Sequence, residues 1–333
     1  PLHETLICPK TSLHFNNLQF ISVRMTKTKS QTTDTILMIR PAQFGFNTET
    51  ADTNTFQNEP VESSQQDNLT KALIEFDDFI QLLREHKIYV IVLQDPGLPV
   101  TPDSLFPNNW ISFHDDTVVL YPMLAKNRRM ERRAGWISLL KQMFQHNKEI
   151  DLSGYETQEK YLEGTGSLVL DRVNKIAYAN LSSRTHEIAL QQFTDKIKYE
   201  LVLFKATDNH GKEIYHTNVL MSIGEKTAVL CSEVMHNETE RNKVLEKMSA
   251  YQEVVEISYQ QLLQFAGNML LVKNRDGVKF WVMSEQAFHS LTAKQKKQLE
   301  KDGALIYAPL YTIEKIGGGS ARCMMAEVFL GGS

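Results

Sequence analysis

Hydrophobic positions recur along the chain with two periods that alternate from one segment to the next. In residues 69–86 they fall three and four apart, which is typical of an amphipathic helix with one face on a core. Residues 89–93 form a continuous apolar run that ends at an Asp-Pro-Gly turn, which predicts a buried strand. Residues 35–39 predict a first strand that stops before Pro41, because proline has no N–H to donate to a strand ladder.

The same alternation continues toward the C-terminal end. Further strands are predicted at residues 117–121, 167–170, 176–179, 200–204, 218–223, 228–231, 269–272, 279–283 and 304–307. Further helices are predicted at residues 132–145, 186–193, 240–248, 292–301 and 321–329. Groups of strand, strand, helix and strand return at intervals of roughly 60 residues, as in an internally repeated fold. Because no change of composition separates the groups, we predict one α/β domain over residues 35–333.

Two polar regions interrupt this pattern. Residues 1–34 are irregular, and the segment that begins at Met25 is similar to an ordinary translation start. We therefore expect an N-terminal extension that is in part not native to the protein, with an ordered N-terminal arm as the alternative. Residues 48–67 predict a long loop, and long loops in compact domains tend to be functional or disordered.

Composition and charge narrow the class of protein. A hydrophobic fraction of 42% and a charged fraction of 23% fit a globular chain with a substantial core. The net charge of −4 argues against a dedicated nucleic-acid binder, and no apolar run approaches the ~18 residues of a membrane span. Because no basic stretch joined to an apolar core occurs near the N-terminal end of the sequence, we expect no secretory signal. Three cysteines are an odd and sparse set, which argues against a disulfide scaffold. We expect a cytoplasmic protein with a small-molecule partner, neither nucleic acid nor membrane, and leave its oligomeric state open.

A triple glycine at residues 317–319 leads into the last predicted helix. Ser320 is a suitable N-cap for that helix, which places Cys323 in its first turn. Unpaired N–H groups and the helix dipole favour an anion there, so we expect a reactive thiolate. The alternative is an unreactive buried cysteine that follows a flexible loop.

A second pair of glycines follows Glu163, just before the strand predicted at 167–170. A carboxylate at such a sheet edge can contact a substrate, although a simple turn residue is the alternative. A phosphate-binding loop is excluded because no Lys-Ser/Thr pair follows and the next predicted element is a strand. His216 lies at the head of the strand predicted at 218–223 and is a weak candidate alone. No Cys-x-x-Cys pair or His-Glu-x-x-His helix is present, so we assign no metal and no cofactor.

In their joint order, several short motifs resemble the guanidino-group-modifying superfamily, the pentein fold of arginine deiminases, dimethylarginine hydrolases and amidinotransferases. The chain is most similar to the arginine deiminase-related branch that includes citrulline-utilising hydrolases. The resemblance covers residues 35–329 and implies a five-bladed, pseudo-symmetric α/β propeller that acts on an amino acid. The motifs are Arg40-Pro41, Phe106-Pro107-Asn108-Asn109-Trp110, Leu162-Glu163-Gly164, Ser183-Arg184-Thr185, His216-Thr217-Asn218 and the glycines before Cys323.

The resemblance also implies roles for individual residues. Cys323 would be the nucleophile, His216 the acid and base, and Glu163 the carboxylate that contacts the substrate or polarises His216. Arg184 would hold the α-carboxylate of the substrate by a bidentate contact. The two adjacent arginines at residues 128–129 could also contact a carboxylate, but we interpret them as a solvated surface pair.

Two departures from the arginine-directed members point to the substrate. Where those members carry carboxylates that clasp a guanidinium, this chain has Asn109 and Asn218. Amides offer donors and acceptors but no charge, so a buried guanidinium would lose its ion pairs at a cost of several kcal/mol. A ureido group is neutral and suits paired amides. We therefore expect hydrolysis of citrulline to ornithine, carbon dioxide and ammonia through a covalent adduct on Cys323.

Two classes of alternative stay open. An enzyme of the same fold could act on another substrate as an arginine deiminase, a dimethylarginine hydrolase or an amidinotransferase. The chain could also be a non-catalytic binding descendant that keeps the propeller without turnover.

Overall fold

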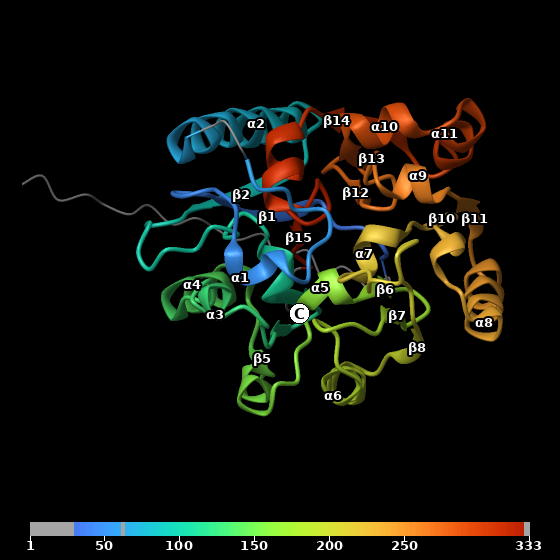
Figure 1. The fold of residues 1–333 in the computed structure, drawn as a ribbon, viewed down its shortest axis with the longest axis horizontal. Coiled ribbons are helices and arrows are strands. Elements are labelled where there is room, and N and C mark those ends of the chain that lie inside the picture. Colours follow the sequence, from blue (N-terminus) through green and yellow to red (C-terminus); the bar gives the residue numbers. More distant parts are fainter. Residues whose placement is uncertain (1–29, 61–63, 330–333) are drawn as a thin grey trace, which may run out of the picture.

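Five three-stranded sheets lie around a common centre in the part of the chain that the computed structural model describes, residues 30–60 and 64–329 (Figure 1). In the second sheet, β3 (Ile111–His114) pairs antiparallel with β4 (Thr117–Leu120), and β4 pairs parallel with β5 (Lys148–Asp151). A helix connects the parallel pair, because parallel neighbours need a long crossover. This blade has the order strand, strand, helix, strand that the sequence predicts as the repeat, although within it only β4 and the helix region at 132–145 were predicted individually.

Three further blades repeat the same connectivity of one antiparallel and one parallel pair. Their strands are β6 (Val169–Asp171), β7 (Ile176–Asn180) and β8 (Glu200–Phe204); β9 (Met221–Ile223), β10 (Thr227–Leu230) and β11 (Glu253–Glu256); and β12 (Leu270–Lys273), β13 (Lys279–Ser284) and β14 (Ala304–Ala308).

The remaining blade joins the two ends of the described chain. β1 (Thr35–Arg40) pairs parallel with β2 (Tyr89–Gln94) and antiparallel with β15 (Ala326–Glu327). The first and last strands thereby close the ring. The five-bladed α/β propeller implied by the resemblance is confirmed.

The longer helices lie on the outer rim, and several short helices lie nearer the centre of the same view (Figure 1). The rim helices are α2 (Gln65–Glu85), α4 (Ala134–Phe144), α6 (Glu187–Ile197), α8 (Glu238–Ser249), α10 (Glu285–Ser290) and α11 (Ala293–Leu299). The short segments are α1 (Thr48–Ala51), α3 (Lys126–Arg129), α5 (Gly164–Ser167), α7 (Thr217–Leu220), α9 (Tyr259–Leu262), η1 (Pro107–Asn109), η2 (Ser153–Gln158), η3 (Ser232–Val234) and the π-helical η4 (Ile313–Gly317).

The hydrophobic core lies between neighbouring blades. One buried cluster joins β1 and α2 to β12, β13 and β14, and another joins β4 to β6, β7 and α6. The innermost strands contact one another around the centre, as β15 does with β3 and β6 does with β9. Each blade therefore covers the apolar faces of two neighbours, and the ring forms one packed body.

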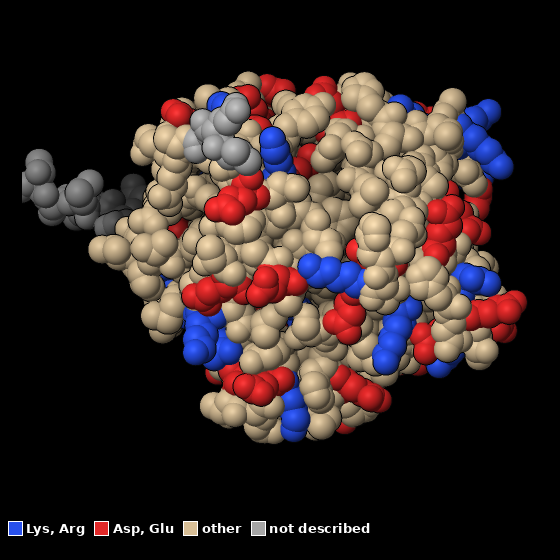
Figure 2. All heavy atoms as spheres, in the orientation of Figure 1, with Lys and Arg blue, Asp and Glu red and all other residues tan. Residues whose placement is uncertain are grey.

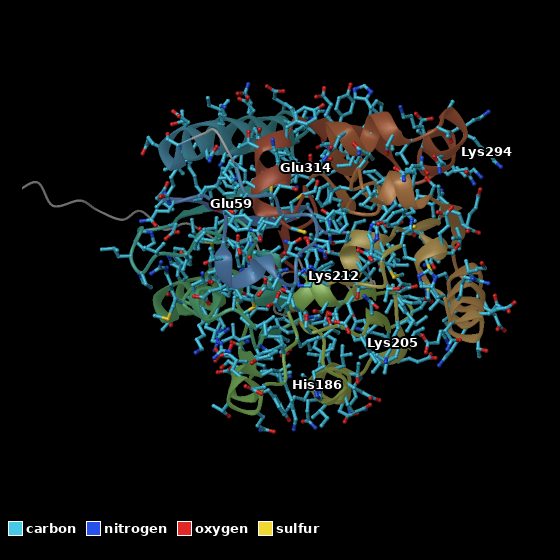
Figure 3. The ribbon with its side chains drawn as sticks, in the orientation of Figure 1. Glu59, His186, Lys205, Lys212, Lys294 and Glu314 are labelled. Carbon is cyan, nitrogen blue, oxygen red and sulfur yellow. The ribbon has the colours of Figure 1, made fainter. Side chains whose placement is uncertain are left out.

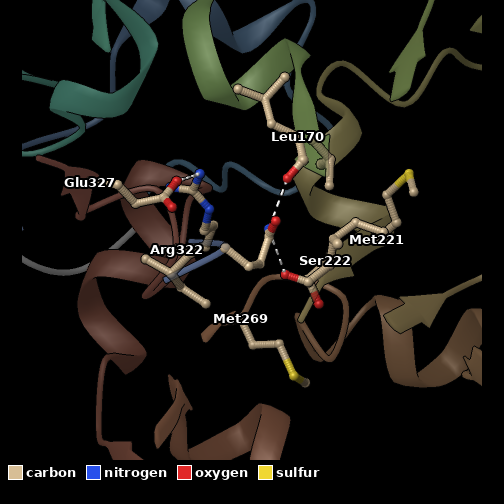
Figure 4. Close-up of a pocket in the computed structure, with 10 residues that line it drawn as sticks. Leu170, Met221, Ser222, Met269, Arg322 and Glu327 are labelled. Atoms are coloured by element: carbon tan, nitrogen blue, oxygen red, sulfur yellow. Dashed lines mark hydrogen bonds and ion pairs between the residues drawn. The ribbon is translucent and has the colours of Figure 1, made fainter. Parts of the chain in front are cut away.

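A cavity of about 20 Å³ lies among the inner strands, with Ser222, Arg322 and Glu327 in its wall (Figure 4). Arg322 Nη2 pairs with Glu327 Oε2 at 2.9 Å, and Gln31 Nε2 donates to the carbonyl of Leu170 at 2.9 Å. These hydrogen bonds surround the small cavity at the centre of the ring. Of the predicted segment 1–34 the structure describes only residues 30–34, and residues 1–29 lie outside it.

The distribution of charge on the surface and the character of the helices agree with the small net charge and the absence of long apolar runs in the sequence. Figure 2 shows acidic and basic side chains interspersed over one face, without a broad field of one sign. Within residues 30–60 and 64–329, no helix combines the length and the apolar character that a membrane span requires.

Several predicted boundaries are wrong next to the centre. The strand predicted at 218–223 begins only at Met221, because Thr217–Leu220 forms the helical turn α7. Likewise, Gly164–Ser167 forms the turn α5 before β6, so the element directly after Glu163 is helical rather than a strand. The edge strand β2 is only partly buried, and β3, β5 and β11 were not predicted. The exposed residues in β5 and β11 leave no continuous apolar run to mark them.

The helix predicted at 321–329 is also wrong. Ser320 donates its hydroxyl to Glu314 Oε1 at 2.6 Å and caps no helix, and residues 321–324 form a single turn. Ala326 and Glu327 instead pair with β1. Tertiary pairing that closes the ring overrides the local helical pattern, so the expected helix dipole at Cys323 is absent.

A core substitution tests this packing. Phe76 of α2 is 0% exposed, whereas Ile74 of the same helix is 57% exposed. We expect Phe76→Ala to lower the free energy of unfolding by about 3–5 kcal/mol, because it removes a buried ring and leaves a cavity. Ile74→Ala is the matched control and should change that free energy by no more than about 0.5 kcal/mol. Urea titration followed by circular dichroism measures both, and equal losses would contradict the assignment of the inner face of α2.

Candidate active site

The two glycines after Glu163 allow three segments to approach one another closely. A Cβ atom on Gly164, whose φ is +48°, would lie 2.3 Å from the carbonyl oxygen of Asn108 in η1. A Cβ on Gly166 would lie 2.5 Å from Asn109 Nδ2 and 2.7 Å from the ring of His216. Glycine is therefore required for α5 to pack against η1 and against the residue that precedes α7.

Glu163 is fully buried at the centre of this contact. Its Oε2 accepts a hydrogen bond from His216 Nε2 at 2.9 Å and one from Arg184 Nη1 at 3.4 Å. Its Oε1 accepts the backbone N–H of Leu124 at 3.1 Å. Of the two roles considered for Glu163, contact with the histidine is the one this geometry displays.

Neighbouring charges determine the protonation state of Glu163, whereas burial determines that of His216. Burial alone would raise the pKa of Glu163, but the Arg184 charge and the hydrogen bond from His216 hold it below its ordinary value. Burial lowers the pKa of His216 to about 4, against the opposing effect of its bond to Glu163. At neutral pH the site therefore holds a carboxylate and a neutral imidazole that can accept a proton.

Cys323 lies next to two side-chain amides. Its Sγ is 3.6 Å from Nδ2 of Asn218, which lies two residues after His216, and 3.3 Å from Nδ2 of Asn268. The cysteine is 3% exposed and forms no disulfide in the described chain. Burial raises the pKa of the other described thiol, Cys231, to about 12.

Hydrogen bonds hold the glycine loop that precedes Cys323. Glu314 lies on η4, directly before this loop (Figure 3), and accepts the Ser320 hydroxyl. On the other side, Tyr215 donates its hydroxyl to the carbonyl of Gly318 at 2.5 Å. The residue next to His216 thereby ties α7 to the loop that carries the cysteine.

Asn109 has one end of its amide fixed. Its Oδ1 accepts a hydrogen bond from Arg128 Nη1 at 2.7 Å, and its Nδ2 donates to Asn108 Oδ1 at 3.0 Å. Arg128 is 2% exposed and also pairs with Glu131 at 2.9 Å, so its interpretation as a solvated surface residue is wrong. Arginine only donates, so the Asn109 oxygen must face Arg128 and its NH₂ group must face away from Arg128.

Arg184 is buried against the segment of residues 47–57, which covers its guanidinium. Its Nη2 donates to Thr53 Oγ1 at 2.7 Å and to the carbonyl of Thr50 at 3.1 Å. Its guanidinium also lies 4.8 Å from the centre of the Tyr215 ring. In this conformation the covering segment accepts the hydrogen bonds of the Arg184 guanidinium.

Asp103 supplies a further charge near this cluster. Its Oδ2 accepts a hydrogen bond from Asn47 at 2.7 Å and lies 3.8 Å from Arg128 Nε, whereas its buried Oδ1 has no partner among the described residues. Burial raises the pKa of this carboxyl. An unpartnered carboxylate oxygen of this kind suits a cationic or N–H-bearing ligand group.

The structure places Glu163 in direct contact with His216 and Arg184 and links it to Asn109 through Arg128, whereas Cys323 contacts Asn218. Sequence reasoning missed Arg128, Asn268 and Asp103. For Arg128 the available signal was Glu131 three residues later, the spacing of a helical ion pair. For Asn268 it was a Gly-Asn pair directly before the apolar strand β12. In residues 30–60 and 64–329, no three His, Cys, Asp or Glu side chains gather into a metal-binding group.

Comparison with known proteins adds a family and a fold. A family model described as eukaryotic N,N dimethylarginine dimethylhydrolase matches residues 40–330. A search of curated proteins gives no match.

Solved structures with the same fold include enzymes of this superfamily. The N-terminal domain of ArgZ, an arginine dihydrolase from cyanobacteria solved with its product, gives a TM-score of 0.69 at 18% identity over 89% of this chain and 98% of that domain. Unliganded AgrE gives 0.70 at 18% identity over 90% of this chain and 40% of its own. A cysteine-to-serine mutant of the dimethylarginine dimethylhydrolase from Pseudomonas aeruginosa, in complex with citrulline, gives a TM-score of 0.63 at 15% identity over 89% of this chain and 99% of its own.

Gly166 offers a direct test of the site geometry. Gly166→Ala would place a methyl group between Asn109 and His216, so we expect kcat/KM to fall by at least ~10²-fold, as displacements of about 1 Å do at reacting centres. The assay uses the amino acid that the parent enzyme hydrolyses. Gly154→Ala is the control, because nothing lies within 4 Å of its Cβ position. Equal activity of the two variants would contradict the close contact.

Proposed function

The chain belongs to the family of eukaryotic N,N dimethylarginine dimethylhydrolases, and on this premise we propose that it hydrolyses the ureido group of citrulline. It is a C–N hydrolase of the pentein superfamily, whose members modify guanidino groups. The proposed products are ornithine, carbon dioxide and ammonia.

The observation that carries the proposal is the orientation of Asn109. Arg128 occupies its oxygen, so the amide presents N–H donors beside His216. One N–H bonds to Asn108, and the other has no acceptor within the described residues. A guanidinium offers only donors and would meet this N–H unfavourably, whereas a ureido carbonyl accepts it.

Asn218 supports the same substrate. It contacts Cys323 Sγ at 3.6 Å through Nδ2 and at 3.9 Å through Oδ1, and among the described residues its side-chain amide makes no other hydrogen bond. A neutral amide can give an N–H to the ureido oxygen or take one from the ureido nitrogen. It supplies no charge to a guanidinium at the reacting centre.

The α-amino acid end of citrulline would be held by opposite charges. We assign the α-carboxylate to Arg184, which would exchange Thr50 and Thr53 for the ligand. We assign the α-ammonium group to the unpartnered oxygen of Asp103. The covering segment of residues 47–57 would therefore shift when substrate binds.

The reaction starts with proton transfer from the Cys323 thiol to neutral His216, whose imidazolium form Glu163 stabilises. The sulphur attacks the ureido carbon, and His216 returns the proton to the leaving Nδ of ornithine as the C–N bond breaks. His216 then deprotonates a water that attacks the carbamoyl carbon and releases the thiolate. The carbamic acid formed decomposes to carbon dioxide and ammonia, which balances citrulline plus water.

The proposal treats residues 35–333 as one catalytic domain, because its first and last strands pair in a single sheet. The buried hydrogen bond of Gln31 favours an ordered arm for residues 30–34. A reducing, cytoplasmic compartment remains part of the proposal, since it keeps the Cys323 thiol available.

A second candidate function is hydrolysis of a methylated arginine or of arginine. The description of the matching family favours the former, and the fold shared with the arginine dihydrolase ArgZ favours the latter. Both substrates carry a guanidinium, so they share the disadvantage at Asn109.

Side-by-side turnover tests the proposal. Citrulline is assayed for release of ornithine and ammonia, arginine for ammonia with citrulline or ornithine, and dimethylarginine for dimethylamine with citrulline. We expect the highest kcat/KM with citrulline. Cys323→Ser should abolish turnover, and Cys231→Ser, at a thiol outside the site, should retain it. A preference for either guanidinium substrate would overturn the assignment of citrulline.

Replacing Asn109 and Asn218 by aspartate tests whether these amides select the substrate. We expect Asn109→Asp combined with Asn218→Asp to raise the ratio of kcat/KM for arginine over citrulline by on the order of 10²-fold, since hydrogen bonds to charged groups are worth about 1.5–3 kcal/mol each. Asn237→Asp adds the same kind of charge at the exposed N-cap of α8 and should leave the ratio unchanged. An unchanged ratio in the double variant would show that these amides do not select the substrate.

A further inference from the structure

The turn that replaces the expected helix leaves Cys323 without a helix dipole, so other groups must stabilise a negative sulphur. Among the described residues, the donors to Sγ are Nδ2 of Asn268 at 3.3 Å and Nδ2 of Asn218 at 3.6 Å. A ureido substrate brings no positive charge of its own to the thiolate. Besides the imidazolium that His216 forms on taking the thiol proton, these amides are therefore the hydrogen-bond donors that face the sulphur within the described chain.

The Asn268 amide is fixed at both ends. Its Oδ1 accepts the backbone N–H of Arg322 at 3.1 Å, and its Nδ2 donates to the carbonyl of Asn218 at 2.8 Å as well as to the sulphur. The side chain is 0% exposed. Because Arg322 directly precedes the cysteine, one amide grips both the backbone before Cys323 and its sulphur.

The backbone that carries Asn268 is equally confined. A Cβ atom on the preceding Gly267 would lie 2.4 Å from the carbonyl oxygen of Val219, in α7. The segment before β12 thus presses directly against the turn that carries Asn218. Asn218 itself lacks such side-chain tethers within the described residues and can turn toward a ligand.

We propose that Asn268 is a catalytic residue that stabilises the Cys323 thiolate, which leaves Asn218 for the ureido group. This inference rests on the proposed function for its substrate, but its physical content concerns the free enzyme. An N–H held in place before the reaction stabilises developing charge without reorganisation of the site.

The role fits each step of the reaction. When the thiol proton passes to His216, the sulphur gains the charge that the Asn268 N–H faces. The charge moves to the ureido oxygen as the S–C bond forms. Hydrolysis of the carbamoyl group breaks that bond and returns the electron pair to sulphur, opposite the same donor.

Alkylation of the free enzyme tests the proposal without any substrate. Asn268→Asp keeps the acceptor for the Arg322 N–H but replaces the donor with a carboxylate oxygen, and Asn268→Ala removes both. We expect iodoacetamide to alkylate Cys323 at neutral pH about tenfold or more slowly in both variants, with the pH profile moved to higher pH. Peptide mass spectrometry quantifies Cys323 separately from the other cysteines, and circular dichroism gives the folded fraction.

Asn274→Ala is the matched control. Asn274 is also buried and makes hydrogen bonds at both ends of its amide, but to the backbone around the β12–β13 turn and to His86. It should lose stability and keep the alkylation profile of the parent. A folded Asn268→Asp protein with the parent profile would overturn the proposal.

Citrulline turnover separates this inference from the proposed function. If the Asn268 variants show a shifted alkylation profile but the parent enzyme does not hydrolyse citrulline, the role of Asn268 stands and citrulline is rejected as the substrate. If the parent enzyme hydrolyses citrulline but the variants keep the parent alkylation profile, citrulline stands as the substrate and the role of Asn268 is rejected.

Discussion

Antiparallel pairing of β15 with β1 is the constraint on which the site depends. It closes the ring and fixes the chain just after Cys323, far in sequence from the carboxylate and the histidine. The turn at residues 321–324 then places the sulphur beside Asn218 and Asn268. Ring closure thus brings the cysteine near the end of the described chain to Asn218, which lies two residues after His216.

Within the closed ring, burial decides which groups carry charge. It keeps His216 neutral, while Arg184 keeps Glu163 ionised against the same burial. Arg128 orients Asn109 by occupying its oxygen. The charged residues thereby set the states of their neighbours, and the groups beside the sulphur are neutral amides, an arrangement that suits a neutral reacting carbon.

The fold was predictable where local pattern and burial agree. Apolar runs and helical spacing gave the central strand of each blade and most rim helices, and their repetition indicated the propeller. Edge strands such as β5 lack that pattern because they are exposed. The turns at α5 and α7 were missed because contacts between segments, such as Gly166 against His216, decide them.

The site was predictable to the extent that its residues stand in recognisable motifs. Cys323, His216 and Glu163 were reached in that way, but the helix expected to support the cysteine was not formed, because residues 326–327 pair with β1. Arg128 was assigned to the surface since a charged pair in a short segment gives no sign of burial. Asn268 stands in none of the motifs that carry the resemblance, and the Gly-Asn pair before β12 does not by itself indicate a contact with the sulphur.

Mass spectrometry of the parent enzyme, quenched in acid during turnover of citrulline, tests the central claim most directly. The account predicts one carbamoyl group on the peptide that contains Cys323, absent when citrulline is omitted. Turnover with an unmodified Cys323, or with the carbamoyl group on another residue, would contradict it.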